Sequence, residues 1–373
     1  MCSGKCNLGT NKACRCHYNY GIVEPKQKLK MKKKALFVGG TGTISSAITR
    51  LVAAQADWEL TLLNRGTRNS DLPENVKVIQ ADIKKDDVAA MIGDEVYDVV
   101  AEFIGFVPED VERDFRIFND HTRQYIFISS ASAYQKPVEH YLITEETPLD
   151  NPFWEYSRNK KACEELLRRY EAEEGFPVTI VRPSHTYCER SVPVAVHGDK
   201  GSWQVVKRMM EGKPVIIHGD GNSLWTLTHN TDFAQGFFGL MGNARAVGET
   251  FHLTSDESLT WNQIYQALAD ALGVKLHACY VPSKMLAANG KYDMTGNLLG
   301  DKANTVVFDN SKLKSVVPGF KAKVGYRDGV KRVVDYILKH EECQVPDPEF
   351  DLWCDRIVAV MEDAACQTAA ITV

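Results

Sequence analysis

The sequence predicts an α/β protein whose main body is a doubly wound parallel sheet, followed by a smaller lobe. Short apolar runs alternate with amphipathic helical segments through the first half of the chain. A glycine-rich turn joins the first apolar run to the first helical segment. Polar residues follow several of the later runs, at the strand ends where open α/β sheets bind ligands. Together these observations predict a Rossmann-type fold.

Composition places the chain among ordinary globular proteins and argues against two kinds of partner. It has 373 residues, of which 44% are hydrophobic and 25% charged, enough for one large domain or two smaller ones. A formal net charge of -5 gives no broad attraction to nucleic acid. No apolar run approaches the ~18 residues of a membrane span. Cysteines scattered without a pairing pattern suggest a reducing, cytoplasmic location.

The first 30 residues stand apart from the rest. They hold four crowded cysteines beside His17, namely Cys2, Cys6, Cys14 and Cys16. This spacing matches no zinc or iron–sulfur template, so we assign no metal site, and metal binding is kept as an alternative. Residues 1–30 are predicted to be a disordered leader, and Met31 offers a second natural start.

The glycine turn predicts a dinucleotide site. The apolar run 34–39 leads into Gly-Gly-Thr-Gly-Thr-Ile, and a helical run follows. Glycines let the backbone approach a pyrophosphate, which then lies on the helix N-terminus. Ser45 replaces the third glycine of the usual fingerprint. The residues expected to contact the cofactor here are Gly39, Gly42, Thr43 and Ile44.

The end of the second predicted strand favours NADP over NAD. An NAD site usually has an acidic residue there, but this chain has Asn64 and Arg65, with Arg68 close behind. A guanidinium suits a 2′-phosphate, although Arg65 stacking on adenine is the alternative. The third predicted strand ends at Asp82 and Ile83, also assigned to the cofactor. Asp82 fits either an adenine contact or a cap of the next helix.

Two residues raise further questions about chemistry. Glu102 lies in the fourth predicted strand, where an apolar side chain is expected, so it is either functional or at the strand end. Tyr156 and Lys160 are four apart and share one face of a predicted helix. A lysine ammonium about 4 Å from the phenol, at an effective dielectric of ~20, is worth roughly 4 kcal/mol. That would lower the tyrosine pKa by about three units from its usual value near ~10.

Three motifs in this order, GGTGTIS, ISSASAY and YSRNK, resemble the short-chain dehydrogenase/reductase superfamily. The length, RPSHTY and GDGNSLWTLTHNTD resemble its extended branch, the NAD-dependent epimerase/dehydratase family, over about residues 33–340. The resemblance implies that Ser130 is the catalytic hydroxyl and Tyr156 the acid/base. It also implies that Lys160 is the partner of Tyr156 and binds the nicotinamide ribose. A homodimer is implied as well.

The substrate positions depart from the family pattern. Members that act on nucleotide-diphosphate sugars usually have Asn where this chain has His185, and a diphosphate-binding Arg where it has Trp225. An indole cannot replace a bidentate guanidinium. We expect Ser132, His185 and Trp225 to contact a carbohydrate or similar substrate. Local hydrogen bonding of Ser132, burial of His185 and packing of Trp225 are the alternatives.

The predicted organisation has four parts. Residues 31–185 form the dinucleotide-binding domain, with parts of 226–260 returning to it, and 186–225 with 261–340 form the substrate lobe. Residues 341–373 form a helical tail, packed on the body or on a second subunit through a face made of Trp353, Ile357, Val360 and Met361.

The function predicted from these residues is NAD(P)-dependent hydride transfer at a carbinol carbon, as an epimerase, dehydratase or dehydrogenase/reductase. Two rival classes remain. The chain also resembles the chloroplast stem-loop RNA-binding proteins, so a non-catalytic RNA- or protein-binding role is one alternative. A cofactor-sensing regulator is the other. The net charge and the intact Ser130, Tyr156 and Lys160 set argue for an enzyme.

Overall fold

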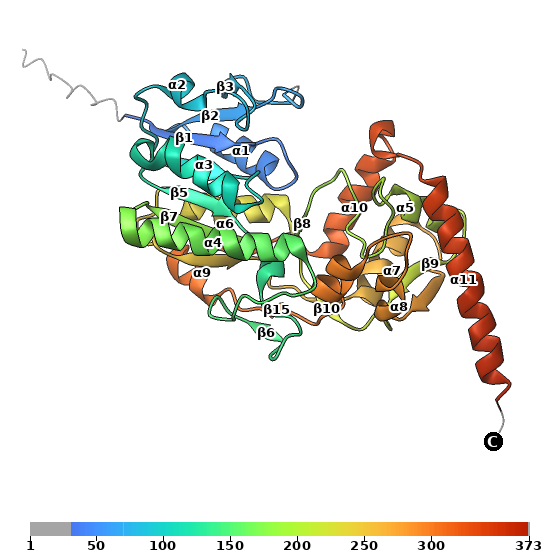
Figure 1. Cartoon of the computed structure of the whole chain (residues 1–373). Helices are drawn as coiled ribbons and strands as arrows, with labels where there is room; N and C mark the ends of the chain where they lie inside the picture. The colour runs from blue at the N-terminus through green and yellow to red at the C-terminus, as the bar shows by residue number, and fades with distance from the viewer. Residues whose placement is uncertain (1–30, 70, 372–373) are drawn as a thin grey trace, which may run out of the picture. The chain divides into compact units, whose positions relative to one another are not determined.

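A parallel sheet of seven strands forms the core of the described chain, residues 31–69 and 71–371 of a computed structural model. The strands follow the order β12-β7-β5-β4-β1-β2-β3, and each neighbouring pair is parallel (Figure 1). They are β1 (Lys33–Val38), β2 (Trp58–Asn64), β3 (Lys77–Gln80), β4 (Val99–Glu102), β5 (Tyr125–Ile128), β7 (Val178–Pro183) and β12 (Thr250–Leu253). The predicted leader, residues 1–30 with its cysteines and His17, lies outside the described residues.

Strand β1 shows why the sheet carries helices on both faces. Ala35 and Phe37 pack into a cluster with residues of α1 and α6, whereas Leu36 and Val38 pack into another with residues of α3 and α4. A strand segment buried on both faces is expected to be apolar, as residues 35–38 are, whereas Lys33 and Lys34 stand at the less buried start of β1. The helices that cover the sheet are α1 (Ser45–Ala53), α2 (Val88–Ile92), α3 (Pro108–Phe118), α4 (Glu155–Glu174) and α6 (Asn230–Leu240). The predicted doubly wound α/β fold is confirmed.

A third apolar cluster gathers the later elements of the chain. Its helices are α5 (Trp203–Met210), α7 (Trp261–Leu272), α8 (Ser283–Ala287), α10 (Tyr326–Ile337) and α11 (Pro348–Ala369), with a π-helical segment, Thr295–Lys302. Helix α9 (Ser311–Val316) instead adds Leu313 to the cluster of α1 and α6. Short two-stranded pairs complete this part: β9 (Val215–His218) with β14 (Ala278–Val281), and β10 (Leu224–Trp225) with β13 (Leu259–Thr260).

Two other short pairs join segments that are distant in sequence. Strand β8 (His185–Tyr187) pairs with β11 (Leu227–His229), and β6 (Leu142–Ile143) pairs with β15 (Val307–Phe308). Strand β12 then completes the large sheet beside β7. These crossings bring residues near 130, 185, 225 and 300 toward one region. The domain boundaries given above remain a prediction.

The tail helix corrects one sequence expectation. Helix α11 packs through Trp353, which is 8% exposed, and Ile357 and Met361 also contact the later cluster. Val360 is 56% exposed and does not belong to the buried face. The helix is also fixed by charge, because Arg208 Nη1 lies 2.7 Å from an oxygen of both Asp351 and Asp355. The apolar spacing alone therefore predicted too wide a buried face.

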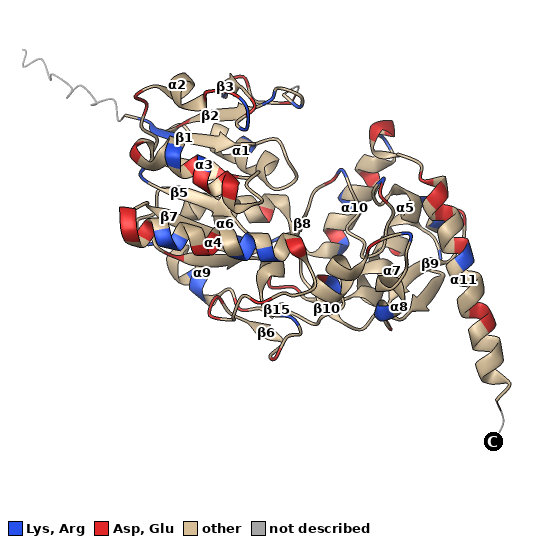
Figure 2. Ribbon diagram, viewed as in Figure 1, with Lys and Arg blue, Asp and Glu red and all other residues tan. Residues whose placement is uncertain are grey.

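Charged positions are distributed along the outer helices. Figure 2 shows acidic and basic residues along α3, α4 and α11, whereas the strands of the sheet are mostly uncharged. Among the described residues, no helix is long and apolar enough to cross a membrane. In the same part of the chain, no group of three or more His, Cys, Asp or Glu side chains is arranged to hold a metal ion.

Candidate active site

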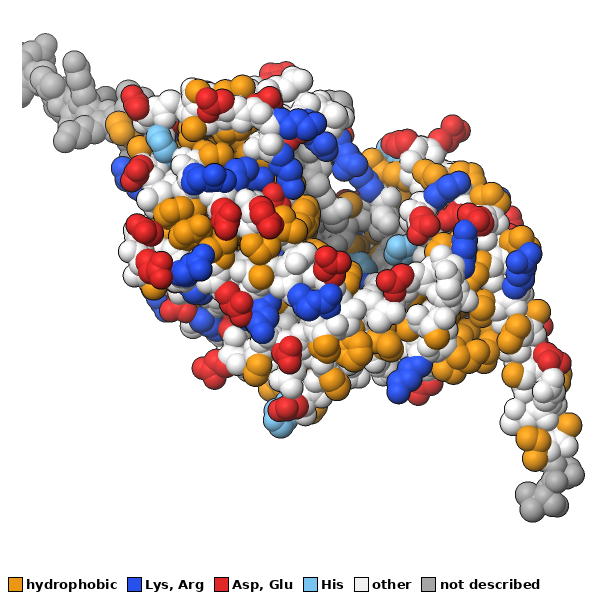
Figure 3. All heavy atoms as spheres, viewed as in Figure 1, with side chains coloured by type: hydrophobic (Ala, Val, Ile, Leu, Met, Phe, Trp, Pro, Cys, Tyr) orange, Lys and Arg blue, Asp and Glu red, His pale blue; other side chains and the backbone are white. Residues whose placement is uncertain are grey.

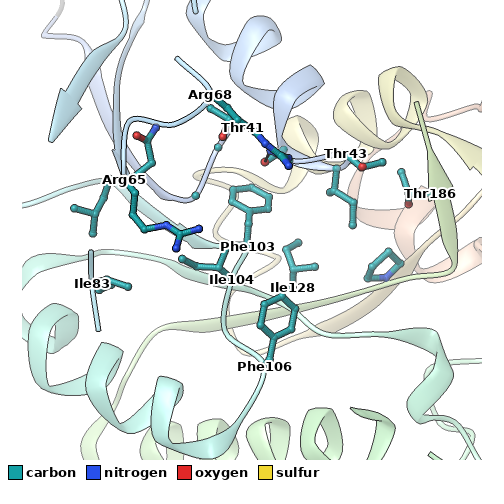
Figure 4. A pocket seen from close by; sticks show the side chains of 18 of the residues that line it. Thr41, Thr43, Arg65, Arg68, Ile83, Phe103, Ile104, Phe106, Ile128 and Thr186 are labelled. Carbon is teal, nitrogen blue, oxygen red and sulfur yellow. Dashed lines mark hydrogen bonds between the residues drawn. The ribbon is translucent and has the colours of Figure 1, made fainter. Parts of the chain in front are cut away.

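A cavity of about 780 Å³ lies at the carboxyl ends of the parallel strands. Its walls come from the segments that follow β1, β2, β3, β4, β5 and β7, which is where a doubly wound sheet binds ligands. Figure 4 shows part of this wall, including Phe103, Ile104 and Phe106 from the segment after β4. All the residues predicted to bind the cofactor line it: Gly39, Gly42, Thr43, Ile44, Asn64, Arg65, Asp82, Ile83 and Lys160.

The glycine turn has the geometry that a pyrophosphate needs. Gly39 and Gly40 have φ of 103° and 95°, which side chains rarely adopt. A Cβ on Gly40 would lie 2.6 Å from Leu62 Cδ2, so the prediction missed a residue that only glycine suits. The Ser45 hydroxyl accepts the Gly42 N–H at 3.0 Å. No side chain caps the start of α1 at Ile44, which leaves amide donors for an anion.

The end of β2 and the segment that follows it offer donors that have no partner among the described residues. Arg65 and Arg68 are exposed, line the cavity, and make no hydrogen bond or ion pair with any residue that the structure describes (Figure 4). Asn64 Oδ1 accepts the Gly66 N–H at 2.8 Å. Its buried Nδ2 has no hydrogen-bond partner within the described chain. A buried donor without a partner is unusual and fits a missing ligand oxygen.

Asp82 does not cap the next helix, so that alternative is wrong. Helix α2 begins after Asp87, whose Oδ1 accepts the Ala90 N–H at 3.1 Å. Asp82 instead accepts the Lys84 N–H at 3.1 Å and lines the cavity. The adenine contact stays a prediction.

Lys160 is buried beneath the cavity and is held by two carbonyl groups. Its Nζ donates to Gly105 O at 2.7 Å and to Ile128 O at 2.6 Å. The rings of Phe106 and Phe127 lie 5.0 and 4.7 Å from the same nitrogen. Burial lowers the pKa of Lys160 to about 8.

Tyr156 lies one turn earlier on α4, and its electrostatics differ from the sequence expectation. The centre of its ring is 5.8 Å from Lys160 Nζ. Burial raises the pKa of Tyr156, and the neighbouring Ser130 hydroxyl acts in the opposite direction. The Lys160 ammonium donates its hydrogen bonds to the two carbonyl oxygens and not to the phenol. The expected lowering of the Tyr156 pKa is therefore absent from the protein alone. Sequence spacing predicted the shared helix face but not the direction of the side chains.

Glu102 lies at the end of a strand and stabilises the turn that follows it. It is fully buried as the last residue of β4, and its carboxylate accepts the Ile104 N–H. Arg113 Nη2 lies 3.6 Å from the other carboxylate oxygen. Burial, assisted by the charge of Asp114, raises the pKa of Glu102 well above its usual range. The turn that Glu102 holds includes Gly105, whose carbonyl binds Lys160.

A second cavity of about 270 Å³ adjoins the first and shares Ser130, Tyr156 and His185 with it. All three predicted substrate residues line it: Ser132, His185 and Trp225. Burial lowers the pKa of His185 to about 3, so its ring is neutral at ordinary pH. Ser132 Oγ is 2.8 Å from Ser130 Oγ and accepts a hydrogen bond from Ser157 Oγ at 2.8 Å.

Trp225 fits both of the interpretations that the sequence left open. It is 3% exposed and stacks on Trp261, with 5.8 Å between ring centres. It also lines the second cavity, and its indole N–H is buried with no partner among the residues described. The side chain is therefore packed and still offers a hydrogen bond.

Several other residues of this cavity were not predicted, and those with charged or indole side chains are Lys136, Trp154, Asp301 and Lys302. They come from the loop after β5, the residue before α4 and the end of the π-helical segment. No short motif links these segments. The only signal was the proximity of Lys136 and Trp154 to the motifs ISSASAY and YSRNK.

The chain is similar to one known family and to several known proteins. Residues 35–253, more than half of the chain, match the model of the NAD-dependent epimerase/dehydratase family. A 2′-dehydrokanamycin reductase from Streptomyces kanamyceticus is 25% identical over 307 residues, 82% of this chain and 84% of that protein. A chloroplast stem-loop binding protein of 41 kDa from Arabidopsis thaliana is 25% identical over 276 residues, 69% of this chain and 68% of that protein.

Solved structures show the same fold. The UDP-glucuronic acid 4-epimerase from Bacillus cereus, determined with UDP-glucuronic acid and NAD, superposes with a TM-score of 0.66 at 19% identity. The similarity covers 82% of this chain and 99% of that one. The resemblance drawn from the three sequence motifs is confirmed.

Proposed function

Because the chain belongs to the NAD-dependent epimerase/dehydratase family, we propose that it transfers hydride at a carbinol carbon of a sugar or sugar-like substrate. It is an enzyme of the short-chain dehydrogenase/reductase superfamily. One observation carries the proposal. Ser130 and Tyr156 line both cavities, so they stand where a dinucleotide in the larger cavity would meet a substrate in the smaller one.

The larger cavity suits NADP, which we favour over NAD. The glycine turn and the uncapped start of α1 would hold the pyrophosphate, and Asp82 with Ile83 would face the adenine. Asn64 Nδ2 would donate to the adenosine ribose, and Arg65 with Arg68 would hold the 2′-phosphate. When bound, the nicotinamide supplies or accepts the hydride.

The residues of the chain provide the proton chemistry. Tyr156 transfers a proton to or from the substrate oxygen, and the Ser130 hydroxyl hydrogen-bonds that oxygen while it has carbonyl character. The raised pKa of Tyr156 means that the phenol keeps its proton at neutral pH in the protein alone. It is then ready to donate that proton to a carbonyl undergoing reduction. Lys160 holds the Gly105 and Ile128 carbonyls and is proposed to bind the nicotinamide ribose.

Two measurements test this function. Denaturing the purified protein and identifying the released nucleotide shows which dinucleotide it carries. A panel of sugars is then assayed for reduction of NADP, with wild-type protein and Tyr156→Phe. We expect the phenylalanine variant to bind NADP normally and to lose about 10²- to 10⁴-fold in turnover. Full turnover by this variant would contradict the role given to Tyr156.

A role in binding RNA or protein is the second candidate, favoured by the similarity to the chloroplast stem-loop binding protein. On the face shown in Figure 3, acidic and basic side chains are interspersed, except for a row of basic ones along one rim of a hollow. Filter binding to a stem-loop RNA at two salt concentrations tests this candidate, because phosphate contacts weaken steeply with salt.

A homodimer and a cytoplasmic location remain predictions.

A further inference from the structure

The second cavity contains a buried lysine with no partner. Lys136 is 4% exposed and lines the cavity. Its side-chain nitrogen makes no hydrogen bond, and no carboxylate lies within 4.0 Å of it, anywhere in residues 31–69 and 71–371. Only its backbone is held, through a hydrogen bond of 2.8 Å from the Lys136 N–H to Asp150 O. Lys136 Nζ keeps some accessible surface in the cavity, while the rest of the side chain is buried. An ammonium with little water around it and no carboxylate beside it favours an anion as the ligand.

The neighbouring charges leave the cavity with an excess of positive charge. Lys302 is also buried and is already occupied, because its Nζ donates to Asn297 and lies 3.8 Å from Asp301 Oδ2. Asp301 is the acidic residue whose negative charge acts on Lys136, where it partly offsets the lowering of the Lys136 pKa by burial. In their charged forms, the two lysines and one aspartate sum to one positive charge, and burial acts on the pKa of all three toward the neutral form. A ligand group with a single negative charge would balance it.

The uncharged donors of the cavity also lack hydrogen-bond acceptors among the described residues. The Trp225 indole N–H has no partner within the described residues. His185 is neutral, so it adds no charge and can donate one ring hydrogen. A carboxylate has two oxygens that accept hydrogen bonds and no donor, which matches an ammonium and an indole N–H.

The size of the cavity limits the ligand. Its volume, about 270 Å³, is about a third of the 780 Å³ of the cavity assigned to the dinucleotide. A nucleoside diphosphate sugar is comparable in size to a dinucleotide, so only part of one could lie within it. The family position for a diphosphate-binding arginine is Trp225, which is packed against Trp261. Size and chemistry both favour a molecule no larger than one sugar ring with short substituents.

We propose that the substrate is a monosaccharide-sized sugar acid whose carboxylate is bound by Lys136, at the opposite end from the carbon that faces Tyr156. The proposal rests on the function proposed above and specifies its substrate class. Lys136 fixes which ring carbon faces the nicotinamide. Ser130 and Tyr156 act on that carbon.

The test uses the full chain with NADP and measures binding of D-glucuronate, D-glucose, glucose 6-phosphate and D-glucosamine by calorimetry. We expect D-glucuronate to bind about tenfold or more tightly than D-glucose, because a charge-assisted hydrogen bond is lost with the carboxylate. Lys136→Met should reduce this preference to about one. Lys339→Met, at an exposed lysine outside both cavities, should keep it.

The other arms identify the charge. If glucose 6-phosphate binds more tightly than D-glucuronate, the anion site stands, but its ligand group is a phosphate and the sugar-acid assignment is wrong. Equal binding of all four sugars, preference for D-glucosamine, or a glucuronate preference that survives in Lys136→Met would overturn the inference. Lys136→Gln provides a second variant, and normal NADP affinity shows that each variant is folded.

A matched experiment separates this inference from the proposed function. Tyr156→Phe should bind D-glucuronate like the wild type and lose turnover. If D-glucuronate shows no preference while Tyr156→Phe loses turnover on another sugar, the sugar-acid inference fails and the proposed function stands. If binding depends on Lys136 but no sugar reduces NADP or is converted to another sugar, the proposed function fails and the anion site stands.

Discussion

The two cavities that meet at Ser130 and Tyr156 are built in different ways. The larger one is made by backbone turns at the ends of consecutive parallel strands, so its residues occur in short motifs. The smaller one is made by side chains from segments near 136, 154, 225 and 301, which are distant in sequence and are joined by tertiary contacts such as the pairs β6–β15 and β10–β13. The cofactor site is therefore readable from local sequence, and the substrate site depends on tertiary structure.

The sharpest test of the larger cavity is its choice between two dinucleotides. Arg65 and Arg68 have no protein partner in the described chain, so their charge is available to a 2′-phosphate. Replacing both by alanine should weaken NADP binding by about 2–4 kcal/mol and leave NAD binding nearly unchanged. Dissociation constants for both dinucleotides measure this. An equal loss for both would instead support stacking of Arg65 on adenine.

The glycine turn gives a smaller effect with a matched control. Gly40→Ala would place a Cβ 2.6 Å from Leu62 Cδ2 at a φ of 95°. We expect a loss of about 1–3 kcal/mol in unfolding free energy, together with weaker dinucleotide binding. At Gly42, the nearest heavy atom to a new Cβ is Ser45 Oγ at 3.6 Å, so Gly42→Ala should cost less stability. Denaturant unfolding of both variants compares them, and equal losses would contradict the close approach at Gly40.

Sequence reasoning recovered the larger cavity and only part of the smaller one. The cofactor residues were found because each lies at a strand end, a position fixed by periodicity and by glycines. The direction of the Lys160 side chain was not predictable, because the Gly105 and Ile128 carbonyls that hold it come from two other strand ends. Lys136 and Lys302 were missed because they are far apart in sequence, and an isolated lysine usually indicates a solvated surface.

Glu102 lies at a strand end that the sequence locates, but its protonation depends on burial by the folded protein. Its pKa is raised in the folded protein, so the native state holds the proton more tightly than the unfolded chain. The stability from this proton is fully present below the unfolded pKa, near 4.5, and is lost as pH rises through the folded value. A glutamine has no proton to lose. Its amide oxygen can still accept the Ile104 N–H, and its amide nitrogen can donate to Asp114.

Glu102→Gln should therefore gain stability relative to the wild type as pH increases, by about 1–2 kcal/mol between pH ~5 and pH ~8. Denaturant unfolding at both pH values measures the difference, and Glu112→Gln, at an exposed acid on α3, is the control. A difference between Glu102→Gln and wild type that does not change with pH would mean that Glu102 is ionised when folded, held by Arg113. In that case the ion pair between Glu102 and Arg113 would stabilise the turn after β4 and hold the Gly105 carbonyl beside Lys160.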